Sequence, residues 1–347
     1  MGFVKLRIHG KAISVHKAAI NPDFASRTVL VTDTWDYVDL WLKRRQKEQA
    51  LFYWQQARDF YVASSQLPKT SSPLTAYYCF LNAAKTLLIV NGTKFSELHG
   101  LGGRSPDQKR ALLQDEVIEL EGSGVAPALC GYLKENLQPG PFSLKDILFN
   151  LVYIHRAYNL TFKSQSELFI PIASPEFVRK EGSSESWFCA DINDPRYMNT
   201  FTLKKLSPSF ERDIGAKKPF VVRKKKRFSW DSKSGASQKN IEELKQYHRK
   251  LRKELFYIYG PNRLWYIKRT SGIKNLIDHS SLSLTLWAMH RLSELARYQP
   301  TILAKHFSSR HNWLLSEFIA TAPYQFIDEI SSEITGHEFM IPGRRTP

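Results

Sequence analysis

An apolar stripe at helical spacing runs along residues 73–90 and constrains the fold more than any other segment. Pro73 suits the first turn of a helix, and Asn91 with Gly92 ends the pattern. The stripe recurs every three or four residues, at Leu74, Tyr77, Tyr78, Leu81, Ala84, Lys85 and Leu88. A helix with such a face has to pack against other elements, so the segment predicts the centre of a helical core.

Helical spacing recurs at both ends of the chain, whereas the middle has another pattern. The further segments with helical spacing are 35–66, 105–120, 126–135, 143–158, 281–299 and 300–334. Short alternating runs such as ELFIPIA and SWFCADI predict antiparallel strands over about 160–230. A basic amphipathic helix then ends at Gly260-Pro261. We therefore predict a mainly α fold with an inserted antiparallel β-rich segment (α+β), its helical core built from the N- and C-terminal parts.

The same patterns divide the chain into four regions. A strand-like N-terminal arm precedes a helical domain, a β-rich basic insertion follows, and a C-terminal helical region packs back on the helical domain. The boundaries that we expect for these regions are 1–34, 35–160, 161–235 and 236–347.

The chain is strongly basic. Its 347 residues hold 50 Lys and Arg against 33 Asp and Glu, a net charge of +17, which predicts an anionic partner such as nucleic acid, an acidic protein or an anionic surface. Cys79, Cys130 and Cys189 form no CxxC pair, which argues against disulfides and a zinc cluster. No apolar run approaches the roughly 18 residues of a membrane span. We expect a cytoplasmic protein without a metal or cofactor.

Several segments resemble the YaaC-like family of bacterial proteins. They are the aromatic-rich FYWQQARDFYVASSQ, the following PLTAYYCFLNAAKTLLI, the LHGLGGR loop, LLQDEV, and the C-terminal SLSLTLWAMHRLSELARYQP. The similarity covers about residues 50–120 and 275–320. It implies no established activity, because none is known for the family.

The helical pattern is also loosely similar to HEPN-type domains, several of which are RNases of bacterial toxin and antiviral systems. The signature of those RNases is an Arg followed four to six residues later by His. No arginine of this chain has that spacing: Arg297 precedes His306 by nine positions, and His99 stands before Arg104. This departure argues against HEPN-like RNase activity.

The glycine-rich LHGLGGR stretch, residues 98–104, carries the first candidate site. Its backbone N–H groups and Arg104 could hold a phosphate in front of a helix that begins at Ser105. It matches no established phosphate-loop pattern, however, and follows a helix rather than a strand. The structural interpretation, which we favour, is an interhelical turn in which Gly100, Gly102 and Gly103 supply positive φ angles. His99 and Arg104 remain weak catalytic candidates.

Lys85 and Gln56 carry the second candidate, because both lie on otherwise apolar helical faces. An unpaired buried ammonium is unfavourable, so we expect Lys85 to pair with Asp115 or Glu116. Such a pair beside His99 could perform acid–base chemistry. We favour the alternative, a buried polar network that determines how the helices dock.

A basic segment between residues 204 and 253 is the third candidate and the one that we expect to bind nucleic acid. Cations hold phosphates, and the neighbouring aromatic side chains could stack on exposed bases. The alternative is a solvated, Lys-rich sheet edge. The predicted binding residues are Lys217, Lys218, Arg223, Lys224, Lys225, Lys226, Arg227, Phe228, Trp230, Arg249, Lys250, Arg252 and Lys253.

The fourth candidate is HFSSRHNW, residues 306–313, in which His306 and Arg310 are four apart and would share a helical face. That spacing suits an RNase-like or phosphate-binding pair, and the alternative is a polar surface turn.

The sequence thus favours a non-enzymatic protein that binds nucleic acid as a component of a bacterial system. By analogy with the HEPN-type domains, that system could be one of antiviral defence. We also expect a protein partner that is encoded by a neighbouring gene. The alternatives are a metal-independent, HEPN-like nuclease of ribonuclease type, and a protein-interaction subunit of a larger complex.

Overall fold

The computed structural model describes residues 2–105, 111–137, 140–216, 218–231, 237–261 and 264–340. Helices hold 45% of the chain and strands 18%, and the largest sheet has eight strands. The fold is therefore α+β, and the predicted mainly α class is wrong. The difference arises because strands also form in 101–120, where the sequence predicts a helix, and in 255–268, within the region assigned to the C-terminal helices.

The chain forms two compact units, each assembled from segments that are distant in sequence. The sheet unit comprises residues 1–29, 167–274 and 336–338, and the helical unit comprises residues 30–166, 275–335 and 339–347.

These boundaries differ from the four predicted regions, because backbone ladders decide them. The central strand β8 (Phe169–Lys180) pairs with β1 (Phe3–Lys5) from the N-terminal arm. It also pairs with β14 (Leu264–Lys268) from the region assigned to the C-terminal helices. Local patterning shows that a segment is extended, but not which strand it will join.

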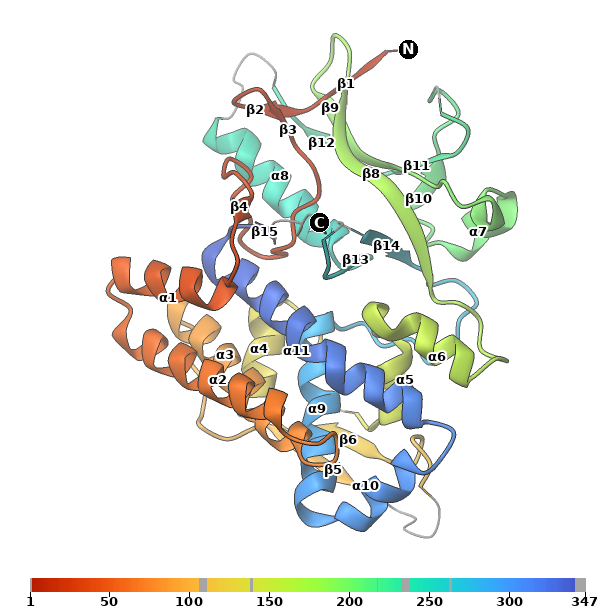
Figure 1. Ribbon diagram of the computed structural model, residues 1–347. Coiled ribbons are helices and arrows are strands. Elements are labelled where there is room, and N and C mark those ends of the chain that lie inside the picture. Colours follow the sequence, from red (N-terminus) through yellow and green to blue (C-terminus); the bar gives the residue numbers. More distant parts are fainter. Residues whose placement is uncertain are drawn as a thin grey trace, which may run out of the picture. The chain divides into compact units, whose positions relative to one another are not determined.

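Helix α3 (Ser72–Val90) is the core helix of the helical unit, as the apolar stripe predicts. Of its 19 residues, 14 are buried. It packs against α2 (Glu48–Gln66), α9 (Ser281–Tyr298) and α11 (Asn312–Thr335), so the core does come from both ends of the chain (Figure 1). By length and composition α3 could also cross a membrane, but 72% of its apolar window is buried against the rest of the protein, as in the core helix of a soluble protein.

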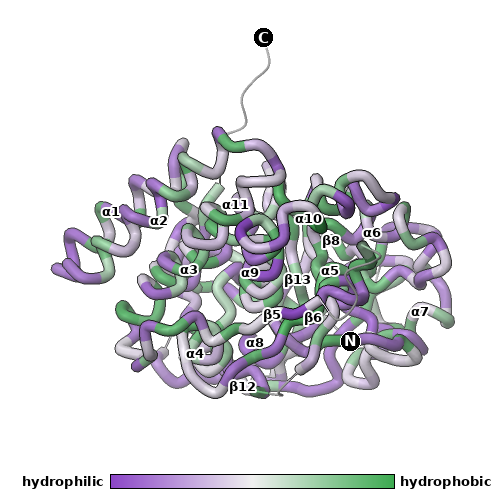
Figure 2. Tube along the Cα trace, turned by 90° about the horizontal axis from the view of Figure 1, so that it is seen from below, coloured by the Kyte–Doolittle hydropathy of each residue, from purple (hydrophilic) through white to green (hydrophobic). Residues whose placement is uncertain are grey.

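Helix α1 (Thr34–Arg44) begins where the sequence places a cap. The Asp33 carboxylate accepts a hydrogen bond of 2.7 Å from the Trp35 backbone N–H. Figure 2 shows hydrophilic residues interspersed with apolar ones along α1 and α2, in keeping with amphipathic helices that bury one face. The other helices of this unit are α4 (Val125–Tyr132), α5 (Leu144–Phe149), the 3-10 helix η1 (Val152–Ile154), α6 (His155–Thr161) and α10 (Pro300–Phe307).

A three-stranded sheet in the helical unit replaces the helix predicted over 105–120. It consists of β5 (Leu101–Arg104), β6 (Val117–Leu120) and β7 (Phe142–Ser143). Strands β5 and β6 are antiparallel, with Arg104 opposite Val117. The segment 117–120 is therefore extended because a partner strand is present, although its own spacing is compatible with a helix.

The sheet unit is built on an antiparallel sheet in the order β10-β11-β9-β8-β14-β13, with β1 added beside β8 and β12 beside β9. Its remaining strands are β9 (Glu185–Asp191), β10 (Phe210–Arg212), β11 (Val221–Lys224), β12 (Phe228–Ser229) and β13 (Leu255–Ile258); β2 (Arg7–Ile8) pairs with β3 (Lys11–Ala12), and the helical elements are η2 (Pro195–Tyr197), α7 (Thr200–Lys205) and α8 (Gln238–Leu251). Two short strands, β4 (Val29–Leu30) and β15 (Phe339–Met340), complete the described elements.

The two faces of this sheet differ in what they bury. Alternate residues such as Phe188 and Val222 join a large apolar core with Leu244 and Leu251 of α8. The residues between them face the other way and form a smaller cluster, Val178, Trp187, Cys189 and Val221. Among the candidate binding residues, Arg223 and Arg227 lie beside this smaller cluster, against the Trp187 ring.

Candidate functional site

Nearly all of the positive charge belongs to the sheet unit. That unit holds 29 Lys and Arg against 14 Asp and Glu, a net +15 of the chain's +17. The helical unit is close to balance, with 21 Lys and Arg against 19 Asp and Glu. A long-range attraction for anions therefore originates in the sheet unit.

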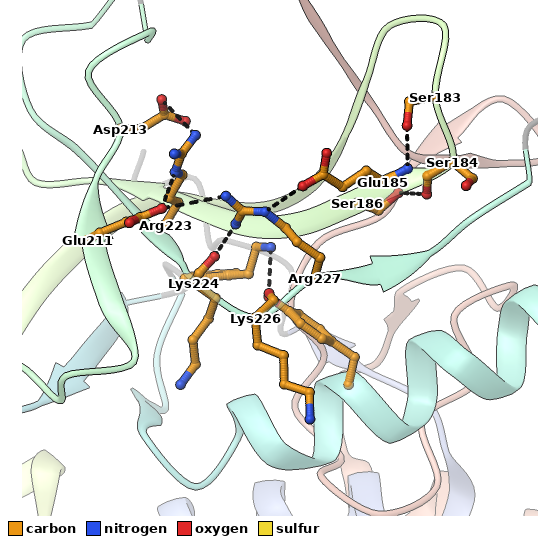
Figure 3. A network of polar contacts seen from close by, with 12 residues as sticks. Ser183, Ser184, Glu185, Ser186, Glu211, Asp213, Arg223, Lys224, Lys226 and Arg227 are labelled. Carbon is orange, nitrogen blue, oxygen red and sulfur yellow. Dashed lines mark hydrogen bonds and ion pairs between the residues drawn. The ribbon is translucent and has the colours of Figure 1, made fainter.

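Two arginines of the predicted basic segment, Arg223 and Arg227, converge on one carboxylate. Arg223 stands opposite Glu211 in the β10–β11 ladder, and its Nε donates to Glu211 Oε1 at 2.8 Å. Arg227 Nη2 lies 3.5 Å from the same oxygen, and its Nε lies 3.2 Å from Glu185 Oε1 (Figure 3). Both guanidiniums are half-buried. Ion pairs within the unit thus engage part of the charge that the sequence assigns to a partner.

Lys224 faces the opposite side of β11 and is buried. It stands opposite Phe210 in the ladder, its ammonium lies 4.4 Å from the centroid of that ring, and it pairs with Glu254. Lys224 therefore has a structural role and does not belong to a surface patch that could bind a partner.

Several of the other predicted cations have partners within the unit, and several are exposed to solvent. Lys218 pairs with Asp191, Arg249 donates to the Ile20 carbonyl at 3.3 Å, and the Arg252 guanidinium lies 5.1 Å from the centroid of the Trp265 ring. The solvent-exposed ones are Lys218, Lys225, Lys226, Lys250 and Lys253. Lys217 lies outside the described residues.

The two aromatic residues of the segment are not available to stack on bases. Trp230 is only 3% exposed and belongs to the large core of the sheet unit. Phe228 packs against that core, with its ring centroid 4.6 Å from that of Tyr247. The predicted stacking role is wrong for both, because apolar rings next to a strand are buried by α8.

The LHGLGGR stretch is a turn followed by strand β5, and not a turn between two helices. Gly100 has a φ of +74°, as the interhelical-turn interpretation requires, but Gly102 and Gly103 are ordinary strand residues. Arg104 is exposed and its Nε lies 3.0 Å from Glu119 Oε1. Arg104 therefore points toward a neighbouring strand and does not join His99.

The predicted polar network is wrong in its partners. Lys85 is buried, as expected, but pairs with Glu97, and Gln56 accepts a hydrogen bond of 2.8 Å from the Asn82 side chain. Asp115 is half-buried beside Glu116. Helical spacing shows that Lys85 needs a partner, but a partner on a loop carries no such spacing.

Glu116 is instead the centre of a buried charged cluster. Its Oε2 accepts from Arg291 Nη2 at 2.8 Å and from Ser105 Oγ at 2.6 Å, and its Oε1 lies 3.0 Å from His306 Nε2. Arg291 Nη1 also donates to Glu294 Oε2 at 2.9 Å. Burial acts to raise the pKa of Glu116, but hydrogen bonds from His306 and Ser105 and the charge of Arg291 outweigh it, so the pKa is lowered.

His306 and Arg310 do not share a face. His306 is fully buried in α10, whereas Arg310 lies beyond the end of that helix, with its guanidinium 5.5 Å from the centroid of the Phe162 ring. The predicted pair is therefore wrong, and the surface-turn alternative is wrong for His306.

His99 belongs to a second group, next to the cluster. Its Nδ1 lies 2.8 Å from Tyr77 Oη, and its ring centroid is 6.0 Å from that of His290. Burial and the nearby charge of Lys85 lower the pKa of His99. Burial, with the charges of His99 and Arg291, lowers the pKa of His290 to about 3. Both shifts favour the neutral form of the imidazole, and a pKa of about 3 makes His290 a poor proton acceptor at neutral pH.

Sequence reasoning missed His290, Arg291 and Glu294. A signal was present, since His290 and Arg291 each lie about one turn before Glu294 in a largely buried helix, where charged residues need partners.

Cys130, Glu135 and His279 form the metal-compatible group among the described residues, with ligand atoms within 4.8 Å of one another. The Glu135 oxygens accept from the Ser280 backbone N–H at 2.7 Å and from Ser283 Oγ at 2.8 Å. The carboxylate therefore caps the start of α9, which accounts for its burial without an ion.

Gly103→Ala is expected to destabilise the helical unit by about 1–3 kcal/mol, because overpacking forces neighbours to move. A Cβ there would stand 1.8 Å from Glu294 Oε2 and 2.8 Å from Arg291 Nη1. The matched control is Gly102→Ala, whose Cβ would meet Glu121 Oε1 at an ordinary 3.6 Å. Urea unfolding of both variants measures the difference, and equal midpoints would contradict the packing at Gly103.

The fold and these clusters define a two-unit α+β protein with a basic sheet unit and a buried ion cluster in its helical unit. A family model described as YaaC-like protein matches residues 16–334, so the chain belongs to the YaaC-like family. No curated protein and no solved structure matches the chain.

Proposed function

We propose that the sheet unit binds nucleic acid through phosphate contacts. The observation that carries the proposal is the charge distribution, since +15 of the chain's +17 lies in this unit. Lys225, Lys226 and Lys250 are exposed, and polyanionic backbones are the partners that such lysines suit. With Phe228 and Trp230 in the core, the binding is expected to depend on phosphates and little on base identity.

The cellular setting is part of the same proposal. We place the protein in the cytoplasm, since Cys79, Cys130 and Cys189 are free thiols, as in a reducing compartment. A role in a bacterial, antiviral-type system with a protein partner is supported only by the loose likeness of the helical pattern to HEPN-type domains.

The test is a salt titration of binding to labelled single-stranded and duplex oligonucleotides. Phosphate contacts release counterions, so log K should fall linearly with log salt, with a slope of about −0.7 to −0.9 per contact. Binding that is absent at low salt, or that does not change with salt, would rule the proposal out.

A second candidate function, a metal-independent hydrolase, is favoured by the His99 group. His99 is half-buried, its pKa is lowered, and Tyr77 holds it beside His290, so it is a suitable general base. Arg291 follows His290 directly in the sequence of α9.

His99→Ala is expected to reduce any RNA cleavage by about 10²-fold or more, because a general base contributes about 10²–10⁴-fold. Wild type, His99→Ala and a control, His9→Asn at an exposed histidine of the sheet unit, are incubated with total RNA without divalent metal. Cleavage that survives in His99→Ala, or its absence in the wild type, excludes this candidate.

A further inference from the structure

A cavity of about 500 Å³ opens on the face of the sheet that carries the smaller apolar cluster. Its lining includes Trp187, Glu211, Asp213, Arg223 and Arg227. Three of these side chains share one face of the sheet because of the strand register. Glu211 stands opposite Arg223, and Arg223 stands opposite Cys189. Trp187 is two residues before Cys189 and therefore lies on the same face. The volume lies within the range of about 300–1,000 Å³ that small-molecule sites have.

Glu211 occupies the place of an anionic ligand in this cavity. Arg223 Nε and Arg227 Nη2 both point to Glu211 Oε1, at 2.8 and 3.5 Å (Figure 3). The arginines are held from behind, since their guanidiniums lie 5.8 and 4.6 Å from the centroid of the Trp187 ring. The Glu211 side chain is 34% exposed and can turn toward solvent. Two pre-oriented guanidiniums would then face the cavity.

Two buried polar atoms on the cavity wall have no partner among the described residues. One is the Trp187 indole Nε1, a donor, and the other is Asp213 Oδ2, an acceptor. Both residues are only 6% exposed. Because both atoms are inaccessible to solvent, they lie behind the cavity surface, and recognition of a ligand rests on the two guanidiniums.

The charge of the lining favours a doubly charged anion. Four cations, Lys180, Arg212, Arg223 and Arg227, face three carboxylates, Glu185, Glu211 and Asp213. With Glu211 displaced, the balance becomes +2. A phosphate monoester carries about −1.5 to −2 charges at pH 7, whereas a backbone phosphodiester carries one.

We propose that this cavity binds the terminal phosphate monoester of a nucleic-acid strand, with the phosphate replacing the Glu211 carboxylate between Arg223 and Arg227. This inference rests on the proposed nucleic-acid binding. It adds that the sheet unit recognises the phosphorylated end of the strand.

The experiment compares oligonucleotides of one sequence with a 5′-phosphate, a 3′-phosphate or hydroxyl ends, by fluorescence anisotropy at constant salt. A charge-assisted contact predicts about tenfold or tighter binding for one phosphorylated end. Unlabelled nucleoside monophosphate, as competitor, should remove this preference if the cavity holds the phosphate and its nucleoside. Equal affinity for all three oligonucleotides overturns the inference and leaves the proposed function standing.

Two charge-matched comparisons separate a binding role from a structural one. Glu211→Gln removes the internal competitor and should strengthen the preference for the phosphorylated end severalfold, whereas Glu242→Gln, at an exposed position on α8 with the same change of charge, should not. Arg227→Lys keeps the charge but loses the planar fork, and should abolish the preference. An unchanged preference in Glu211→Gln and Arg227→Lys, with normal thermal unfolding, contradicts the assignment.

Failure of the proposed function gives a different result. If no oligonucleotide binds, calorimetry with nucleoside monophosphate alone tests the cavity directly. Binding that Arg227→Lys abolishes supports the cavity as a monoester site, and no heat of binding overturns it.

Discussion

Glu116→Ala is expected to lower the free energy of unfolding of the helical unit by about 3–5 kcal/mol, the usual effect of removing one partner from a buried ion pair. Glu116 is 2% exposed and Arg291 is 3% exposed. Removing the carboxylate leaves the Arg291 guanidinium buried with Glu294 as its remaining charged partner. His306 and Ser105 lose their acceptor as well.

The matched control is Asp115→Ala, which removes the neighbouring, half-buried carboxylate. Urea unfolding of both variants at pH 7 should show a large loss for Glu116→Ala and little change for Asp115→Ala. Equal losses would mean that the sequence-based pairing with Lys85 describes the protein better than the Arg291 cluster does.

The same cluster should make stability depend on pH in a defined direction. The pKa of Glu116 in the folded protein lies below its ordinary value of 4.5. A lowered pKa stabilises the fold at pH values above the ordinary pKa, and this contribution is lost as pH falls through the folded pKa. The difference between wild type and Glu116→Gln should therefore be constant near neutrality and shrink below about pH 4.5. A difference that grows in acid would contradict the assignment.

Reversing three exposed charges, Lys225→Glu, Lys226→Glu and Lys250→Glu, is expected to weaken oligonucleotide binding by about 10²–10³-fold at low salt. Each phosphate contact that is lost should reduce the salt slope by about 1. These lysines are preferable to Arg223, Lys224 and Arg227, because reversing those three would break ion pairs within the fold.

The control carries the same change of charge on the other unit, at the exposed Lys69, Lys94 and Lys163. Affinity is measured by anisotropy across a range of salt concentrations, and folding by thermal unfolding. If both triple variants lose affinity equally, the effect is one of net charge alone, and the sheet unit is not the binding surface.

Much of the local structure follows from the sequence. The stripe that predicts a helix over residues 73–90 lies in α3, Ser72–Val90, and the Asp33 cap starts α1. One error is instructive, because NTFTLKKL (residues 199–206) lies in the stretch 160–230 that is predicted to form strands, but it forms α7. Its cap explains the difference, as the Asn199 side chain accepts from the Thr202 backbone N–H at 2.9 Å. A capping residue can outweigh strand propensity over one short turn.

The candidate sites were less accessible to sequence reasoning. The sequence shows where the cations are, but not which of them are free to bind a partner. Arg223 pairs with Glu211 only because of the β10–β11 register, which the sequence does not show. Likewise, Lys85 and Glu116 each needed a partner, but Lys85 pairs with Glu97 and Glu116 with Arg291, and not with each other.

The sequence by itself determined the helices of the core, several strands of the insertion, the excess of positive charge and the family resemblance, since each depends on neighbouring residues or on composition. Tertiary structure alone decided which charges are engaged, that LHGLGGR ends in a strand, and that Gly103 lies against Arg291 and Glu294. The physical reason is that Glu116 and Arg291 are 175 residues apart, and no local pattern records a contact between segments that only folding brings together.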